Sequence, residues 1–467
     1  MRKTVILIFF FLALSAGLVK GEIRMPAIFG DNMVLQQQSE ANIWGWANPS
    51  SGVSVKTSWN GKSYSTRADN QGKWRVKVTT PQASKTPYSI TISDGKALSI
   101  NNVLIGEVWI CSGQSNMDMP MSGYSNQPIE NSQDAIVRSK NSNIRLFKYA
   151  RAHNIKPQDD GKGTWTESNP GTVSEFSATA YFFGKLLYDM LDIPVGLIST
   201  NWGGSRIEAW INEDALKEVM PLQVPAQNEG IERPQHTHTL LYNAMIHPLI
   251  GYGIKGAIWY QGESNLFNAS IYPQLFDTMI RSWRKLWQVG EFPVYYAQIA
   301  PYDNGGQYNS AFMRESQLKC MKITPNTGMA VLMDADSPKC VHPPKKKEAG
   351  ERLAYWALAE TYGIKGFNYK SPEIKSTEVK NNTIIISFDN ARKGLTSYGK
   401  PVTQFKIAGK DKRWYDATVT IDQNKVYVFS PRVQEPIAVR YAFQSDSPAE
   451  LFGNDGLPVS SFRTDDW

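Results

Sequence analysis

The stretch V-L-I-G-E-V-W-I-C-S-G-Q-S-N-M, residues 103–117, is the part of the sequence that decides the fold. Its first eight residues form an almost uninterrupted apolar run, which is typical of a strand buried on both faces of a sheet. The small and polar residues that follow predict that the chain leaves the sheet in a turn and presents Ser115 there. Because a serine in a turn is usually only a turn residue, its interpretation depends on what the other strand ends contain.

Later in the chain, further short apolar runs predict more strands of the same kind. They are I-P-V-G-L-I-S-T (193–200), I-K-G-A-I-W-Y (254–260), F-P-V-Y-Y-A-Q-I (292–299) and M-A-V-L-M-D (329–334). Helical stretches such as residues 178–191 separate them. Buried strands that alternate with helices predict a parallel sheet and an α/β domain, which we expect to cover residues 101–365.

The segments on both sides of this domain have β patterns. Residues 22–100 contain short alternating runs separated by N-G and D-G turns, which predict an antiparallel β-sandwich. Residues 366–467 return to strand patterns such as I-I-I-S-F and V-Y-V-F-S. The expected architecture is therefore an α/β domain between an N-terminal and a C-terminal β domain.

Residues 1–21 have the pattern of a secretory signal peptide. Two basic residues precede an unbroken apolar stretch from Val5 to Val19, and V-K-G before Glu22 offers small residues for cleavage. The stretch is shorter than the roughly 20 apolar residues that a membrane-spanning helix needs. We therefore expect an exported protein, periplasmic or secreted, whose mature chain does not insert into a membrane.

Composition excludes some classes of partner. The net charge is +7, but three of the basic residues belong to the signal peptide, so the remaining excess suggests ordinary solubilising charge and no nucleic-acid partner. The three cysteines, Cys111, Cys320 and Cys340, are too few for a disulfide scaffold, although one bridge from Cys320 to Cys340 is possible. The H-T-H sequence at His236 and His238 has no acidic or cysteine partner at ligand spacing. We expect no metal and no cofactor.

Loops after three of the predicted strands contain residues suited to ester hydrolysis, because ligand sites of open α/β sheets lie beyond the carboxyl ends of the strands. Ser115 follows the first strand. N-W-G-G-S-R, residues 201–206, follows the second, and its paired glycines allow backbone N–H groups to approach a substrate oxygen. Q-G-E-S-N, residues 261–265, follows the third and offers amide side chains.

A serine nucleophile needs a base, and the chain has five histidines. His342 lies in V-H-P-P-K-K-K, directly before prolines that open a helix and after the last predicted strand of the α/β domain. Its loop should therefore lie at the same edge of the sheet as Ser115. His247, within L-Y-N-A-M-I-H-P-L-I, is more simply interpreted as a packed core residue.

Together, these segments resemble a known family. The chain is similar to the sialate O-acetylesterase family of SGNH (GDSL-like) hydrolases in F-G-D-N-M-V-L-Q-Q, V-W-I-C-S-G-Q-S-N-M, N-W-G-G-S-R-I-E-A-W, W-Y-Q-G-E-S-N, H-P-P-K-K-K-E-A-G-E-R-L-A and G-L-P-V-S-S-F-R-T-D. The resemblance implies a three-layer α/β/α hydrolase domain. It also implies a serine esterase that releases acetate from O-acetylated sialic acids, which we expect to be 9-O-acetylated, without a metal.

The resemblance implies that Ser115 is the nucleophile and His342 the base. Hydrolases of this superfamily usually place an aspartate three residues before the histidine, whereas Lys339 occupies that position here. Asp336, with Asp334 as the alternative, is the expected partner of the imidazole, because a carboxylate stabilises the imidazolium formed during attack. If neither serves, a backbone carbonyl orients the histidine in a Ser-His dyad.

The resemblance also implies an oxyanion hole. Gly204, with Gly203 as the alternative, would face the developing oxyanion together with the N–H of the nucleophile. A third donor would be Asn265, with Gln261 as the alternative. We further expect Arg206 to pair with the carboxylate of a sialic acid, unless it pairs with Glu208 or solvent instead.

Two other functions stay open at this stage. The same chemistry could serve another acetylated glycan such as xylan. Alternatively, the chain could be a non-catalytic carbohydrate-binding protein in which Trp44, Trp46 and Trp59 stack on sugar rings. Tryptophans at alternating strand positions are more simply interpreted as sandwich core.

Overall fold

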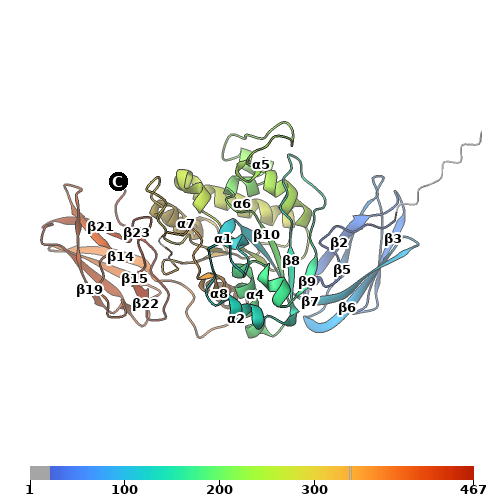
Figure 1. Ribbon diagram of the computed structural model, residues 1–467, viewed down its shortest axis with the longest axis horizontal. Helices are drawn as coiled ribbons and strands as arrows, with labels where there is room; N and C mark the ends of the chain where they lie inside the picture. The colour runs from blue at the N-terminus through green and yellow to red at the C-terminus, as the bar shows by residue number, and fades with distance from the viewer. Residues whose placement is uncertain (1–21, 336, 338) are drawn as a thin grey trace, which may run out of the picture.

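The protein has three parts that lie in a row along its longest axis (Figure 1). The computed structural model describes residues 22–335, 337 and 339–467, so the predicted signal peptide and Asp336 lie outside the described residues. A central α/β part lies between an N-terminal and a C-terminal β-rich part. The predicted fold class, α/β with flanking β regions, is confirmed.

A mostly parallel sheet forms the middle of the central part. Its strand order is β13-β12-β11-β7-β10-β8-β9, and only the β8–β9 pair on this path is antiparallel. The strands are β7 (Ala97–Gly113), β8 (Asn141–Lys148), β9 (Trp165–Ser168), β10 (Val195–Asn201), β11 (Gly256–Tyr260), β12 (Val294–Ala297) and β13 (Thr327–Ala330). All five apolar runs expected to be strands pair in this sheet.

Helices cover both faces of the sheet. Trp109 and Cys111 of β7 pack with residues of α4 (Ala178–Leu191) and α8 (Lys346–Trp356), whereas Ile110 belongs to the core that includes α6 (Tyr272–Trp287) and α7 (Ala311–Ile323). Successive residues of a strand point to opposite faces, so both faces of β7 are buried. The shorter helices are α1 (Ser115–Asp118), α2 (Ser132–Val137), α3 (Pro170–Ser174), α5 (Glu213–Lys217), η1 (Ile207–Trp210), η2 (Pro234–His236), η3 (Tyr242–Ile246), η4 (His247–Leu249), η5 (Glu263–Ile271) and η6 (Ala357–Thr361).

The N-terminal part shares a strand with the central sheet. The first half of β7 pairs with β6 of the N-terminal part, and its second half pairs with β10 and β11. The strands of this part are β1 (Val34–Gln36), β2 (Glu40–Trp46), β3 (Gly52–Thr57), β4 (Ser63–Arg67), β5 (Lys73–Thr79) and β6 (Ser84–Ser93). All their pairs are antiparallel except β1 with β7. The boundary expected after residue 100 therefore falls inside one continuous strand.

Trp44, Trp46 and Trp59 are half-buried, and Trp44 and Trp59 pack against the core, so the expected core position is only partly reached. Burial alternates along β2, with Ile43 and Gly45 buried and Trp44 and Trp46 half-buried. The guanidinium of Arg24 lies 3.5 Å from the ring centroid of Trp46, so the protein's own arginine covers this ring.

The C-terminal part consists of antiparallel sheets. One has the order β14-β15-β20-β19 and another β18-β17-β21-β23, with a two-stranded sheet of β16 and β22. Their bounds are β14 (Glu373–Lys380), β15 (Thr383–Asp389), β16 (Leu395–Thr396), β17 (Phe405–Gly409), β18 (Trp414–Asp416), β19 (Thr418–Asp422), β20 (Lys425–Phe429), β21 (Pro436–Tyr441), β22 (Phe452–Gly453) and β23 (Phe462–Arg463).

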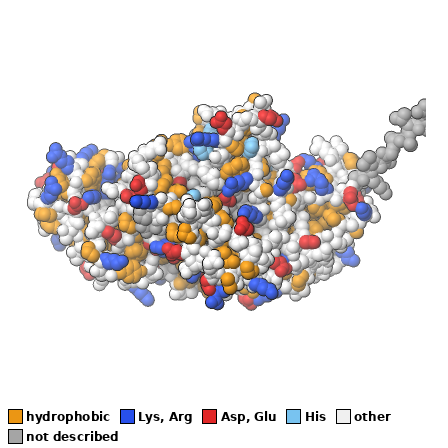
Figure 2. Space-filling model, viewed as in Figure 1, with side chains coloured by type: hydrophobic (Ala, Val, Ile, Leu, Met, Phe, Trp, Pro, Cys, Tyr) orange, Lys and Arg blue, Asp and Glu red, His pale blue; other side chains and the backbone are white. Residues whose placement is uncertain are grey.

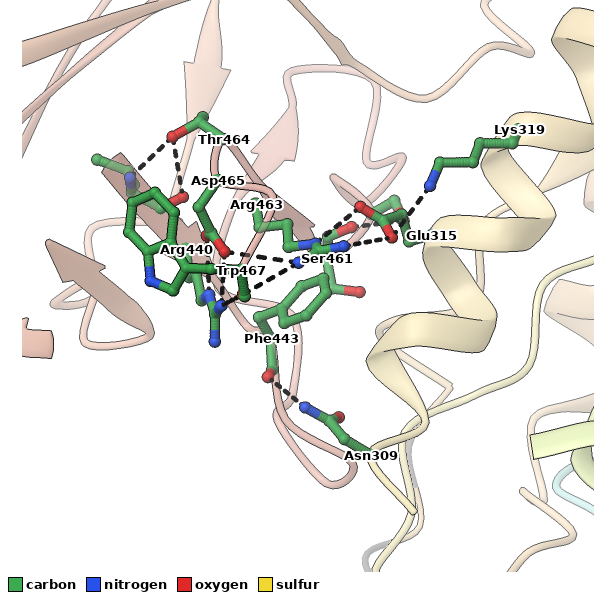
Figure 3. A network of polar contacts seen from close by, with 12 residues as sticks. Asn309, Glu315, Lys319, Arg440, Phe443, Ser461, Arg463, Thr464, Asp465 and Trp467 are labelled. Atoms are coloured by element: carbon green, nitrogen blue, oxygen red, sulfur yellow. Dashed lines mark hydrogen bonds and ion pairs between the residues drawn. The ribbon is translucent and has the colours of Figure 1, made fainter. Parts of the chain in front are cut away.

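Polar contacts fasten the last residues of the chain to α7 (Figure 3). Arg463 Nε donates to Glu315 Oε1 at 3.0 Å. Arg314, which is fully buried, donates from Nε to Ser461 Oγ at 2.9 Å and from Nη2 to the carbonyl of Gln444 at 2.5 Å. The C-terminal part is therefore held on the central part through α7, and also through contacts outside this helix, such as the hydrogen bond from Gln298 Nε2 to Ser460 Oγ at 2.8 Å.

The three cysteines are free, so the possible bridge from Cys320 to Cys340 does not form. Cys320 is buried in α7 and its Sγ contacts the carbonyl of Ser316, four residues earlier, at 3.3 Å. Cys340 lies beside His342 instead, with its Sγ 3.4 Å from the backbone nitrogen of that residue.

The described part of the chain contains no helix that is both long and apolar enough to cross a membrane. Figure 2 shows Lys, Arg, Asp and Glu side chains interspersed over the visible face. That face has no broad basic patch of the kind that binds nucleic acids.

Replacement of Arg314 should destabilise the protein. Arg314→Met leaves buried hydroxyl and carbonyl acceptors without their donor, and we expect the Tm to fall by about 5 °C or more. Lys319→Met, which changes an exposed residue of the same helix, is the control and should shift the Tm by less than about 1 °C. Equal Tm values for the two variants in scanning calorimetry would contradict the structural role of Arg314.

Candidate active site

Three of the segments with candidate site residues begin at the same level of the sheet. In the register of the parallel strands, Gly113 of β7 lies opposite Asn201 of β10 and Tyr260 of β11. Ser115, the glycine pair and the Q-G-E-S-N segment follow directly after these three residues. Register alone therefore brings the three segments together at one edge.

Ser115 is the first residue of helix α1, two residues beyond the end of β7. Gly113 has a φ of 146°, and a Cβ at this position would lie 2.2 Å from the carbonyl oxygen of Tyr260, so only glycine fits. The N–H of Gln114 donates to the same carbonyl at 3.0 Å, and its side-chain oxygen accepts from the N–H of Gly262 at 3.3 Å. This turn leaves Ser115 half-buried at the surface of the sheet edge.

The side chain of Asn116, the residue after the serine, joins three segments. Its Nδ2 donates to Glu263 Oε1 at 2.6 Å and to the carbonyl of Val341 at 3.0 Å. Its Oδ1 accepts from Lys346 Nζ at 2.5 Å. Asn116 is fully buried, and it fixes the Q-G-E-S-N segment and the His342 loop to the serine turn.

Burial shifts the pKa values of the two titratable groups that contact Asn116. It raises the pKa of Glu263, and it lowers the pKa of Lys346 to about 7. The second carboxylate oxygen of Glu263 is buried without a hydrogen-bond partner within the described residues. The amide of Asn116 thus gives each of these two buried groups a hydrogen-bond partner, which offsets part of the cost of removing them from water.

The glycine segment lies against the serine. A Cβ on Gly203 would be 3.5 Å from Ser115 Cβ, whereas Gly204 has a φ of 71° and open space around it. In the described part of the chain, neither glycine N–H donates a hydrogen bond to the backbone or to a side chain. The N–H of Ser115 is likewise at a helix start, where no intrahelical acceptor exists. These N–H groups are candidates for the oxyanion hole, with Gly203 closer to the serine than the expected Gly204.

Asn265 and Gln261 lie beneath the glycine segment and are both fully buried. Asn265 Oδ1 accepts from the N–H of Ile207 at 3.0 Å and from Gln261 Nε2 at 2.7 Å. Asn265 Nδ2 donates to Glu208 Oε2 at 2.9 Å and to Asn268 Oδ1 at 3.1 Å. Both amide hydrogens of Asn265 are engaged in this way, so service as an oxyanion donor would require one of these bonds to break.

His342 is half-buried and contacts two residues of one turn. Its Nδ1 lies 2.6 Å from Gln127 Oε1, and its ring packs edge-on against that of Tyr124 with centroids 5.2 Å apart. The hydroxyl of Tyr124 reaches to 3.5 Å from the carbonyl oxygen of Ser115. No hydrogen bond joins Ser115 to the imidazole among the described residues, and such bonds often tighten only when substrate binds.

Burial and the nearby Lys346 lower the pKa of His342 to about 4. The imidazole is therefore neutral around pH 7. A neutral imidazole can accept a proton, as a general base must.

Asp334, the described one of the two expected carboxylate partners, is paired away from His342. Asp334 accepts two hydrogen bonds from Arg352 of α8, at 2.6 Å each, so its carboxylate is already paired. Asp336 lies outside the described residues, and Lys339 is exposed. The Gln127 contact was not anticipated, because no motif spacing connects two residues that lie 215 positions apart.

Arg206 follows the glycine segment as expected, and it does not pair with Glu208. Its guanidinium lies 4.3 Å from the ring centroid of Phe267, which is exposed. Glu208 accepts from Asn265 and Asn268 instead. Within the described residues, Arg206 has no acidic partner at ion-pair distance, so its charge is available to a ligand.

The H-T-H residues do not form a metal centre in the described part of the chain. His238 Nδ1 accepts a hydrogen bond from the N–H of Gln223 at 3.2 Å. Burial and the charge of Arg206 lower the pKa of His236. No three His, Cys, Asp or Glu residues among those described converge as ligands.

Comparisons with known proteins show the family to which this chain belongs. A family model described as carbohydrate esterase, sialic acid-specific acetylesterase, matches residues 105–356. The sialate O-acetylesterase of Mus musculus is 29% identical over 488 residues, covering 90% of this chain and 89% of its own. That of Homo sapiens is 30% identical over 446 residues, covering 85% and 80%. A carbohydrate acetylesterase from Xanthomonas citri superposes with a TM-score of 0.88 at 34% identity, over 96% of this chain and 100% of its own.

The fold, the site and these matches define a carboxylic ester hydrolase. More particularly, the chain belongs to the sialic acid-specific acetylesterase family of carbohydrate esterases.

The serine turn depends on glycine at position 113. Gly113→Ala should force Tyr260 away from the turn and lower kcat at least about 100-fold, since misplacement by 1 Å has effects of this size. Gly61→Ala is the control, because Gly61 also has a positive φ, 67°, but open space around it. The control should lose about 1 kcal/mol of stability and keep its kcat. Full activity of Gly113→Ala in an aryl acetate assay would refute the steric argument.

Proposed function

We propose that this protein is a serine esterase that removes O-acetyl groups from sialic acids, with Ser115 as the nucleophile and His342 as the base. The observation that carries the proposal is that Gly203 lies beside Ser115 after the end of β7, where a Cβ on Gly203 would be 3.5 Å from Ser115 Cβ. This arrangement places backbone N–H groups without a hydrogen-bond partner among the described residues beside the serine side chain. The chain also belongs to an acetylesterase family.

The proposed reaction has two halves. His342 Nε2 takes the proton of Ser115 Oγ as the oxygen attacks the acetyl carbonyl, and the N–H groups of Ser115 and of Gly203 or Gly204 stabilise the oxyanion. The imidazolium then protonates the departing sugar hydroxyl. In the second half a water molecule, deprotonated by His342, attacks the acetyl-serine, and acetate leaves with Ser115 Oγ–H restored.

Asn265 and Gln261 have a supporting role in this proposal. Their hydrogen bonds hold the carbonyl of Ser205 and the N–H of Ile207, on either side of Arg206. The segment that follows the glycine pair is thereby fixed. A direct oxyanion contact from Asn265 or Gln261 stays a prediction.

The proposed substrate class is an O-acetylated sialic acid, with the 9-O-acetyl ester as the preferred position. The Mus musculus and Homo sapiens relatives are named for this activity. A sialic acid carries a carboxylate, and Arg206 offers a guanidinium without an acidic partner among the described residues, close to the glycine segment. The exposed ring of Phe267 next to it could pack against the apolar face of the sugar.

A second candidate substrate is a neutral acetylated glycan such as xylan. The Xanthomonas citri protein is named only as a carbohydrate acetylesterase, which supports the broader class.

We also propose that the central domain is of the SGNH type and that the protein is exported. The resemblance of the segments that contain Ser115, Gly204, Asn265 and His342 supports the first proposal, and the sequence of residues 1–21 supports the second.

Ser115→Ala should abolish the release of acetate. We expect kcat to fall about 1,000-fold or more on an aryl acetate, since removal of a serine nucleophile leaves only the oxyanion hole and binding. Ser112→Ala, at a buried hydroxyl that donates to the carbonyl of Thr200, is the control for folding. Undiminished turnover by Ser115→Ala would exclude the proposed nucleophile, and a non-catalytic binding protein would lack turnover in the wild type too.

Arg206→Gln separates the two substrate classes. With 9-O-acetylated sialic acid, loss of the charge should raise KM about 10-fold or more, while acetylated xylan and aryl acetate should be hydrolysed as before. Arg151→Gln is the matched control, because Arg151 is paired with Asp118. If the wild type prefers acetylated xylan and Arg206→Gln affects no substrate, the sialic acid assignment is wrong.

A further inference from the structure

We propose that Gln127 is the positioning residue for His342, so that a neutral amide occupies the place where a carboxylate was expected. This inference rests on the proposed function, because it concerns the base of the same reaction. The contact that carries it joins His342 Nδ1 and Gln127 Oε1 at 2.6 Å.

The contact selects the tautomer that catalysis needs. The side-chain oxygen of Gln127 can only accept a hydrogen bond, so Nδ1 of His342 bears the hydrogen. Nε2 then has a free lone pair, which can take the proton of a serine hydroxyl. Gln127 thereby orients the imidazole, which is one of the two functions of a triad carboxylate.

The turn that contains Gln127 is built to hold it in place. The backbones of Tyr124 and Gln127 exchange two hydrogen bonds, of 2.9 and 3.1 Å. Gly123 has a φ of 84°, and a Cβ there would lie 2.5 Å from the carbonyl oxygen of Gln127, so the turn needs glycine. The hydroxyl of Tyr124 also donates to Asp118 Oδ2 at 3.2 Å, while its ring packs on His342. One turn therefore fixes both the ring plane and the Nδ1 bond.

The nearby described carboxylates are bound elsewhere. Asp334 is held by Arg352, Asp118 by Arg151 and Tyr124, and the carboxylate of Glu263 by Asn116. None of them contacts the imidazole. Among the described residues, the titratable groups that face it are Lys346 from α8, Tyr124 from the turn and Cys340 from its own segment.

An amide partner has an electrostatic consequence. A carboxylate on Nδ1 would stabilise the imidazolium and raise the pKa of His342, whereas an amide adds no charge to oppose the burial and the cation that lower it. The neutral form of the His342 imidazole should therefore persist at acidic pH. Since the free base is the active form, kcat/KM should fall only as the pH drops toward about 4.

Gln127→Glu and Gln127→Ala test the inference on an aryl acetate, which does not depend on the identity of the sugar. Gln127→Glu places a charge on Nδ1 and should move the acid limb of kcat/KM upward by about one pH unit or more. Gln127→Ala should lower kcat about 10-fold or more with KM within about 3-fold, because the tautomer is no longer fixed. A general loosening of the structure would not move the acid limb upward.

Two further variants complete the experiment. Ser125→Ala, at an exposed residue of the same turn, should leave kinetics unchanged, and Asp336→Asn should keep kcat within about 3-fold of the wild type. A loss of about 100-fold in Asp336→Asn, with Gln127→Ala near normal, would overturn the inference in favour of an aspartate triad. An unshifted acid limb in Gln127→Glu would overturn it as well. If the proposed function itself is wrong, the result is a different one: the Ser115→Ala variant still hydrolyses the aryl acetate.

Discussion

The buried amide of Asn116 is the interaction on which the site depends. An amide side chain can donate and accept at once, and here it donates to Glu263 and Val341 while it accepts from Lys346. Loss of this amide would leave a buried carboxylate and a buried ammonium without a neutral bridge, which costs more than an ordinary hydrogen bond. Its neighbour Ser115 and the loop of His342 are therefore held in one rigid cluster, although they lie near the beginning and near the end of the α/β part in the sequence.

The two phrases of the family resemblance that lie nearest the ends of the chain have a structural role in this protein. Gln36 and Gln37, from F-G-D-N-M-V-L-Q-Q, donate to the buried carboxylate of Glu107 in the middle of β7. In G-L-P-V-S-S-F-R-T-D, Ser461 accepts from Arg314, and Arg463 pairs with Glu315. Both phrases fasten a β part to the central sheet or to α7, and neither supplies a group to the serine turn.

The electrostatics of the site favour proton acceptance over stabilisation of the protonated base. Burial lowers the pKa of both His342 and Lys346, so the imidazole is neutral at pH 7 and Lys346 loses its charge more easily than an exposed lysine. The imidazolium formed during attack then gains less from its partner than it would from a carboxylate. An anionic oxyanion beside it, and a substrate carboxylate near Arg206, add negative charge only while the substrate is bound.

The sequence by itself determined the order of the three parts and five strands of the central sheet, but not β8 or β9, because period-two and period-3.6 patterns are local. It predicted the strands that pair around β7, the helix at residues 178–191 and the loops of Ser115 and His342. Only the tertiary structure decided how β7 continues through two parts, that Cys320 and Cys340 stay apart, and that Gln127 meets His342. These outcomes are contacts between residues far apart in the chain, and a hydrogen bond of this kind leaves no spacing or period in the sequence from which it could be read.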